Sequence, residues 1–145
     1  MTIDRFQGPM RWLSNFEPCE VHFEGGVYPS SEHAYQAAKF LDPEKRKQIA
    51  ALPTPAAAKK AGAIRNNPEI RPDWFMVALR VMEAVVLDKF SRNPGLRQKL
   101  LDTGDEELIE GNTWGDTFWG VCKGVGSNHL GRILMNVRAS LRKEP

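Results

Sequence analysis

The sequence is poor in the residues that form disulfide frameworks and bind metals. Its two cysteines, Cys19 and Cys122, form no CxxC pair, and it has three histidines in 145 residues. Two cysteines are too few for a disulfide framework, so we expect reduced, partly buried thiols. A lone histidine on a helix, such as His33, is more often structural than a metal ligand. We therefore expect neither a metal site nor a cofactor.

Long apolar runs and a large excess of one charge are also missing. The opening "MTIDRFQGPM" has neither the basic leader nor the apolar core of a signal peptide, and no later segment approaches the length of a membrane helix. We expect a cytoplasmic protein with no membrane partner. Twenty basic residues against eighteen acidic ones give a formal charge of +2, so any anion-binding site must be local.

Neither an internal repeat nor a low-complexity linker divides the chain. A length of 145 residues with 41% hydrophobic content is enough for one core and too short for two comfortable ones. We expect a single domain over residues 1–145, acting as a monomer. Its class is α+β: compact and mainly helical, with a few short strands.

Strand signals flank a helical middle. The segment "CEVHFEGGVYP" predicts a hairpin that turns at Gly25-Gly26, and "EELIEG" predicts a strand in which Leu108 and Ile109 are buried. Short helices are expected in "DPEKRKQIAAL", "TPAAAKKAGAIR" and "PGLRQKLLDTG", and another from about Asn128.

Two further helices are expected to carry broad apolar faces. The helix that begins after Ser31 presents Ala34, Tyr35, Ala37, Ala38 and Leu41 on one side. The longest helix, from about residue 72 to 90, repeats Phe75, Leu79, Met82, Val86 and Phe90 at steps of three and four. This spacing predicts that the longest helix is the axis of the core.

The loop over residues 112–128, "NTWGDTFWGVCKGVGSN", indicates a binding function, because irregular stretches of this length are uncommon in compact domains. Trp114 and Trp119 offer flat apolar surfaces for a base or a sugar ring. The backbone amides around Gly124 and Gly126, beside the start of the last helix, suit a phosphate. Alternatively, the tryptophans anchor the loop and the glycines only form turns; the pattern leaves both interpretations open.

Two acidic residues also have both a structural and a chemical interpretation. Glu32 suits the first turn of a helix, but Ser30 or Ser31 can cap that helix without it. Asp116 is either an exposed turn former or a carboxylate held in an apolar pocket.

Six short motifs occur in order along the chain: "LSNF" (13–16), "YPSSEHAYQAAKF" (28–40), "AIRNNP" (63–68), "RPDW" (71–74), "WGDTFWG" (114–120) and "GVGSNHLGRILM" (124–135). Together they resemble the YbiA-like, or NADAR, family over residues 5–142. The resemblance implies a mainly helical α+β domain with N-glycosidase activity on ribosylated nitrogen compounds. The substrates implied are phosphorylated ribosylaminopyrimidine intermediates of riboflavin synthesis or, in other branches, ADP-ribose attached to guanine.

Carried over residue by residue, the resemblance implies three catalytic positions: Glu32, Trp74 and Asp116. The residues that we expect to bind substrate lie in or beside the same motifs and are Asn15, Arg65, Arg71, Trp119, Gly124, Gly126, Asn128 and Arg132. Breaking a ribosyl C–N bond builds positive charge on the sugar, which a carboxylate stabilises, and a second carboxyl can transfer a proton. We expect Glu32 to handle water or proton transfer, Asp116 to orient ribose or water, and Trp74 to stack on the base or wall off the sugar.

Three functions remain open at this stage. The favoured one is hydrolysis of a small phosphorylated ribosyl amine, which a nearly neutral chain suits. The second is removal of ADP-ribose from guanine in nucleic acid, which should need a basic track that "KKAGAIRNN" and "RASLRKEP" supply only modestly. The third is a non-catalytic ADP-ribose or nucleotide-binding module, which predicts degenerate acids; Glu32 and Asp116 are both intact.

Overall fold

A computed structural model describes residues 1–144 of the chain. Its helices are the 3-10 helix η1 (Gly8–Leu13), α1 (Ser31–Ala37), α2 (Pro43–Ala50), α3 (Pro55–Ala61), α4 (Trp74–Arg92), α5 (Pro94–Asp102) and α6 (His129–Arg142). Its strands are β1 (Thr2–Ile3), β2 (Val21–Phe23), β3 (Gly26–Tyr28), β4 (Glu107–Leu108), β5 (Gly111–Asn112) and β6 (Val121–Cys122). The expected class, mainly helical α+β, is confirmed.

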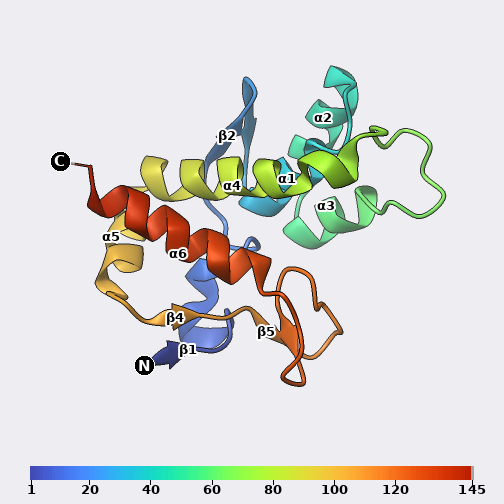
Figure 1. Ribbon diagram of the computed structural model, residues 1–145. Helices are drawn as coiled ribbons and strands as arrows, with labels where there is room; N and C mark the ends of the chain where they lie inside the picture. Colours follow the sequence, from blue (N-terminus) through green and yellow to red (C-terminus); the bar gives the residue numbers. More distant parts are fainter. Residues whose placement is uncertain (145) are drawn as a thin grey trace.

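The two longest helices, α4 and α6, pack along each other and form the centre of the molecule (Figure 1). Both helices contribute fully buried residues to the core, including Val85 and Phe90 of α4 and Leu134 of α6. α5 connects one end of this pair back toward the N-terminal segment. The expectation that the longest helix is the axis of the core is therefore confirmed.

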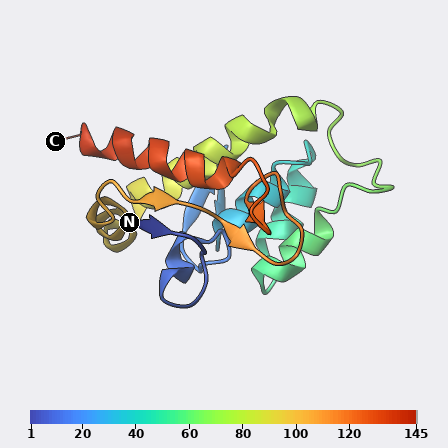
Figure 2. The same cartoon turned by 60° about the horizontal axis from the view of Figure 1, so that its bottom comes forward.

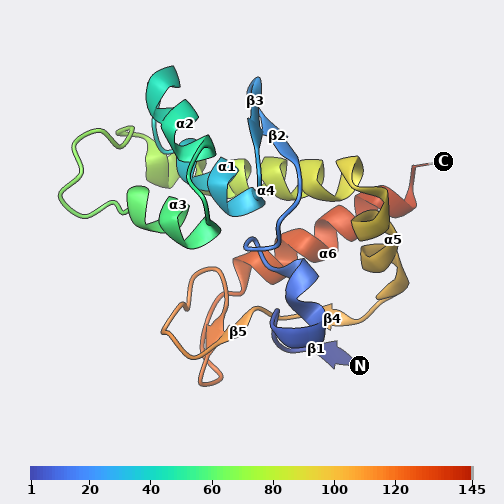
Figure 3. The same ribbon diagram turned by 180° about the vertical axis from the view of Figure 1, so that it is seen from behind.

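The helices α1, α2 and α3 gather around the start of α4, and the β2–β3 hairpin packs on the same helix (Figure 3). The hairpin is antiparallel, and Gly25 turns it with a φ of 84°, a conformation that glycine adopts without strain. The short helices α2 and α3 begin at the signals seen in the sequence. Asp42 caps α2, Thr54 caps α3, and each is followed by proline.

Two parallel strand pairs tie distant parts of the chain together. β1 pairs with β4, so the N-terminus lies beside residues 107 and 108, and β5 pairs with β6 to close the loop between them. These contacts hold the N-terminal segment and the 110–128 segment on one side of α6. None of the helices in residues 1–144 is both long and apolar enough to cross a membrane.

The expected core face of α4 is partly wrong. Met82, Val86 and Phe90 are buried, but Phe75 is 82% exposed and Leu79 is 39% exposed. The core side of the first two turns is made by Trp74 and Ala78 instead. The reason is that this end of α4 borders a pocket, so apolar residues there line a cavity rather than a packed interior.

Two smaller expectations also fail. Leu41 is 61% exposed, because α1 ends at Ala37 and the chain turns before it can continue the apolar face. Ile109 is only partly buried, whereas Leu108 is fully buried, because β4 is two residues long and pairs on one edge only.

Candidate active site

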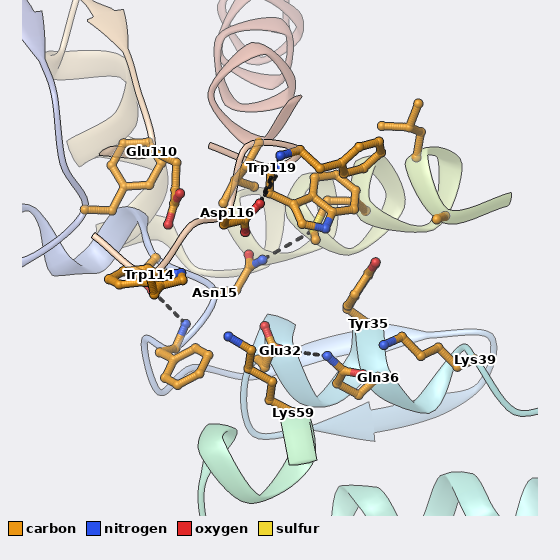
Figure 4. Close-up of a pocket in the computed structure, with 18 of the residues that line it drawn as sticks. Asn15, Glu32, Tyr35, Gln36, Lys39, Lys59, Glu110, Trp114, Asp116 and Trp119 are labelled. Atoms are coloured by element: carbon orange, nitrogen blue, oxygen red, sulfur yellow. Dashed lines mark hydrogen bonds between the residues drawn. The ribbon is translucent and has the colours of Figure 1, made fainter. Parts of the chain in front are cut away.

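A cavity of about 1110 Å³ opens between α1, α3, the start of α4 and the loop after β5. Figure 2 shows the segment of residues 110–128 curving beside α3, and Figure 4 shows the side chains that converge on the space between them. The lining includes six of the residues expected from the sequence, namely Asn15, Glu32, Trp74, Trp114, Asp116 and Trp119. The pocket therefore brings together the three expected catalytic positions.

Glu32 lies in the first turn of α1 and is 7% exposed. Ser30 is the N-cap of this helix, because its side chain accepts a hydrogen bond from the backbone N–H of His33. The Glu32 carboxylate is therefore not used for capping, and its Oε2 accepts a hydrogen bond of 2.6 Å from Gln36 Nε2. Burial raises the pKa of Glu32, while Gln36, Lys59 and Lys39 oppose that rise.

Asn15 connects the N-terminal segment to the start of α1. Its backbone O accepts hydrogen bonds from the N–H of Glu32 at 3.1 Å and from Ser31 Oγ at 3.3 Å, and its Oδ1 accepts from the same Ser31 hydroxyl. Its side-chain amide contacts Met82 Sδ of α4. Asn15 therefore fixes the backbone that carries Glu32.

A buried lysine holds the Asn15 segment in turn. Lys89 Nζ donates hydrogen bonds of 2.9 Å to the backbone oxygens of Trp12 and Ser14, which lie just before Asn15. Burial lowers the pKa of Lys89 to about 8. The core helix α4 thus positions one wall of the pocket through a polar contact, not only through packing.

An aromatic and cationic corner lies beside Glu32. Lys39 Nζ donates to Gly62 O at 2.8 Å and lies 5.4 Å from the ring centre of Tyr35 and 5.7 Å from that of Trp74. Tyr35 packs edge-on against both Trp74 and Trp119. Burial lowers the pKa of Lys39 to about 8, and Glu32 opposes that drop. This corner gives the pocket a wall of aromatic rings around a buried ammonium group.

Asp116 faces Glu32 from the other side of the pocket (Figure 4). Its Oδ1 accepts hydrogen bonds from the backbone N–H groups of Phe118 at 3.1 Å and Trp119 at 2.9 Å. The Asn112 side chain bonds both the backbone N–H and the backbone O of Asp116. The carboxylate is therefore held by the loop and is also a lining group, which combines the two interpretations that the sequence left open.

The glycine-rich end of the same loop does not reach the pocket. Gly124, Gly126, Asn128 and Arg132 are not among its lining residues, and Arg132 is exposed on α6. The backbone N–H groups of residues 127–130 donate to the backbone oxygens of residues 117–120. The amides at the start of α6 are thus used in folding the loop, and the Val125 N–H donates to Cys122 O.

Two further residues expected to bind substrate lie outside the cavity. Arg65 is exposed in the 62–73 segment, which projects from the rest of the molecule in Figures 1 and 3. Arg71 forms a two-point ion pair with Asp73, at 2.6 and 2.9 Å, and its backbone N–H donates to Lys39 O. Arg71 thus supports the start of α4 rather than facing the pocket.

Several lining residues had not been expected from the sequence: Arg11, Tyr35, Gln36, Lys39, Lys59 and Glu110. Gln36 and Lys39 follow Glu32 by four and seven positions, so helical spacing could have identified them. Gln36 Oε1 is buried without a hydrogen-bond partner among residues 1–144. Arg11, Lys59 and Glu110 come from distant segments, and no local pattern marks them. Within the described residues, no three His, Cys, Asp or Glu side chains are placed to hold a metal ion.

Comparison with known proteins gives a consistent result. The NADAR domain matches residues 4–142. The chain is 37% identical over 133 residues to the N-glycosidase YbiA of Escherichia coli, which covers 91% of this chain and 82% of that protein. It is 36% identical over 137 residues to an N-glycosidase of Nostoc punctiforme, covering 92% of this chain and 87% of the relative.

A riboflavin biosynthesis protein of Vibrio vulnificus is 41% identical over 137 residues, covering 91% of this chain. This chain spans only 36% of that longer protein. The solved structure of Escherichia coli YbiA matches with a TM-score of 0.85 at 33% identity, covering 98% of this chain and 84% of that one. The chain therefore belongs to the NADAR domain family.

Proposed function

We propose that this protein is an N-glycosidase that hydrolyses the bond between ribose C1 and nitrogen in phosphorylated ribosylaminopyrimidines, which are early intermediates of riboflavin synthesis. The observation that carries the proposal is the pair of carboxylates, Glu32 and Asp116, on facing walls of one pocket. Relatives named as N-glycosidases support the reaction, and a relative named as a riboflavin biosynthesis protein supports the substrate class.

Glu32 suits the task of activating water. Burial raises the pKa of its carboxyl group, which makes the carboxylate a stronger base, while Gln36 and the nearby lysines favour the ionised form that a base requires. Its place on a rigid first helical turn, held through Asn15, keeps it from moving away as charge develops. We assign Glu32 the removal of a proton from the attacking water.

Asp116 suits the task of stabilising the sugar. Two backbone N–H groups bond its Oδ1, and hydrogen bonds to the charged form favour ionisation. As the C–N bond breaks, positive charge builds on C1 and the ring oxygen of the ribose, so a fixed carboxylate is worth more in the transition state than in the ground state. Asp116 would orient the ribose and stabilise this charge.

The aromatic corner suits the base. Trp74 is 2% exposed and Tyr35 is 7% exposed, so these rings are rigid, and Trp119 closes the same side. A flat pyrimidine stacked among them would lose little conformational entropy and would exclude water from the reacting bond. Trp74 contributes a wall rather than a proton.

The phosphate of the substrate has candidate partners at the mouth of the pocket. Arg11 and Lys59 line the cavity and are exposed, so a phosphate can reach them without being fully desolvated. This assignment differs from the expected contact with the amides near Gly124 and Gly126, because neither glycine lines the cavity.

One observation favours a second candidate function, which is removal of ADP-ribose from guanine. The cavity of about 1110 Å³ is at the upper end of small-molecule sites, and its rim carries exposed Trp114, Phe118 and Phe75, which could stack on a second base. A formal charge of +2 gives little support for the nucleic-acid track that this substrate would need. The smaller substrate therefore remains the favoured one.

The experiment that tests the proposal presents each substrate to the purified protein. A phosphorylated ribosylaminopyrimidine and an ADP-ribosylated guanine oligonucleotide are incubated separately, and the free base and the free sugar phosphate are detected by mass spectrometry. Release of free pyrimidine and free ribose phosphate from the first substrate supports the proposal. Release of ADP-ribose from the oligonucleotide, with no cleavage of the first substrate, supports the second candidate. Binding without release of either product would contradict both and favour a binding module.

A further inference from the structure

A third carboxylate lies in the pocket that the family motifs do not mark. Glu110 follows β4 and lines the cavity beside Asp116, on the wall opposite Glu32 (Figure 4). Neither the motifs nor the proposed roles of Glu32 and Asp116 use it. Its position is nevertheless fixed by hydrogen bonds and by close packing.

One buried side chain bonds both the carboxyl group of Glu110 and the backbone of Asp116. Asn112, which is 8% exposed, donates from Nδ2 to Glu110 Oε2 at 3.0 Å and to the backbone O of Asp116 at 2.9 Å. Its Oδ1 accepts from the backbone N–H of Asp116 at 3.0 Å. The backbone N–H of Glu110 donates to Asn128 Oδ1 at 2.9 Å. Asn128, expected from the sequence to bind substrate, thus fixes the backbone of Glu110.

The loop also leaves room for this carboxyl group at one position. A Cβ atom on Gly120 would overlap Glu110 Oε2 and the backbone O of the same residue. Any side chain at Gly120 would therefore push the Glu110 carboxyl group out of place. The hydrogen bonds and the presence of glycine at position 120 together keep Glu110 facing the pocket.

Glu110 and Asp116 have different surroundings, which suit different tasks. The Asp116 carboxylate accepts hydrogen bonds from two backbone N–H groups, whereas the Glu110 carboxyl group accepts one, from the neutral side-chain amide of Asn112. Burial raises the pKa of Glu110 to about 7; Asp116 adds to that rise, while Asn112 and Lys59 oppose it. The charged groups that act on Glu110 within residues 1–144 are thus Asp116 and Lys59, which oppose each other.

We propose that Glu110 is the general acid of the reaction and protonates the leaving nitrogen from the wall that also carries Asp116. The inference rests on the proposed N-glycosidase function. As the C–N bond breaks, its electron pair goes to the nitrogen, which takes the proton from Glu110. Water adds its oxygen to C1 and gives a proton to Glu32, and exchange of these protons with solvent restores both groups. The products are the free amine and the ribose phosphate.

The test exploits the fact that an acid is needed only by a poor leaving group. Single-turnover rates of wild type and Glu110→Gln are measured on the ribosylaminopyrimidine phosphate and on 4-nitrophenyl ribofuranoside 5-phosphate, whose nitrophenolate leaves without a proton. Glu107→Gln, an exposed glutamate on β4, is the matched control. We expect Glu110→Gln to lose roughly 10²-fold or more on the amine substrate, less than about 10-fold on the nitrophenyl substrate, and the control to lose neither.

The pH profile on the amine substrate gives an independent measurement. The acid must be protonated, so the wild-type rate should fall as pH rises through about 7, and this fall should be absent in Glu110→Gln. Equal losses on both substrates, or a fall with pH that persists in the variant, would overturn the assignment while leaving the proposed function intact. If wild type releases neither product from either substrate, the proposed function itself fails. Circular dichroism of Glu110→Gln checks that a lost rate does not reflect a lost fold.

Discussion

Replacing Phe90 by alanine and, separately, Phe75 by alanine makes the same chemical change at the two ends of α4. Phe90 is fully buried and packs edge-on against Trp12, with ring centres 6.2 Å apart. Phe75 is 82% exposed at the mouth of the pocket. Removing a buried phenyl ring costs about 3–5 kcal/mol of unfolding free energy, because transfer energy is lost and a cavity remains. An exposed ring should change it by less than about 0.5 kcal/mol.

The two variants are compared by thermal unfolding followed by far-ultraviolet circular dichroism. For a domain of this size, each kcal/mol corresponds to a few degrees, so Phe90→Ala should lower Tm by roughly 10 °C while Phe75→Ala stays near wild type. Phe75→Ala should instead raise KM for a ribosyl substrate, because the ring lines the pocket. Equal Tm values, or a larger loss for Phe75→Ala, would refute the placement of α4 in the core.

Two further predictions concern charge. Arg11→Ala should weaken binding of a phosphorylated substrate more than binding of its dephosphorylated form. Arg132 is exposed on α6 outside the pocket, so Arg132→Ala should change neither affinity. Calorimetry of each variant with each form of the substrate checks this, and a selective loss in Arg132→Ala would place the phosphate at the glycine-rich loop. The raised pKa of Glu32 means that the folded state loses stability as this carboxyl group ionises. Glu32→Gln should therefore match wild-type Tm below the ordinary carboxyl pKa and exceed it as the pH rises above that value, and a gap that shrinks with rising pH would contradict the sign.

Local patterns predicted the fold class, the α-helices, the hairpin and β4, because these elements carry their own signals, whereas η1, β1, β5 and β6 were not predicted. The caps Asp42 and Thr54 begin their helices as expected, and the hairpin forms where it was predicted, although its turn is Glu24-Gly25, one residue earlier than expected. The core face of α4 was less predictable, since the spacing that buries Phe90 also includes Phe75. Periodicity distinguishes an apolar face from a polar one, but it does not distinguish a packed interior from the wall of a pocket.

The candidate site shows the same division. Glu32 and Asp116 were expected through family motifs, and both line the pocket, but Glu110 carries no such signal. The position of the Glu110 carboxyl group depends on Asn112 and on the space left by Gly120, which only the folded loop brings together. The glycine-rich end of the loop suggested a phosphate site, yet Gly124 and Gly126 are exposed outside the pocket, and the N–H groups of residues 127–130 bond the backbone oxygens of residues 117–120.

The central claim, that Glu32 is catalytic rather than a helix-starting residue, is tested most directly by single-turnover release of free base from a ribosylaminopyrimidine phosphate. Glu32→Gln keeps the size of the side chain, and Ser30 still caps α1, so the fold and substrate binding should persist. The account predicts a rate lower by roughly 10²-fold or more, with substrate affinity by calorimetry largely unchanged. A wild-type rate in Glu32→Gln would contradict it and leave Glu32 as a structural residue of α1.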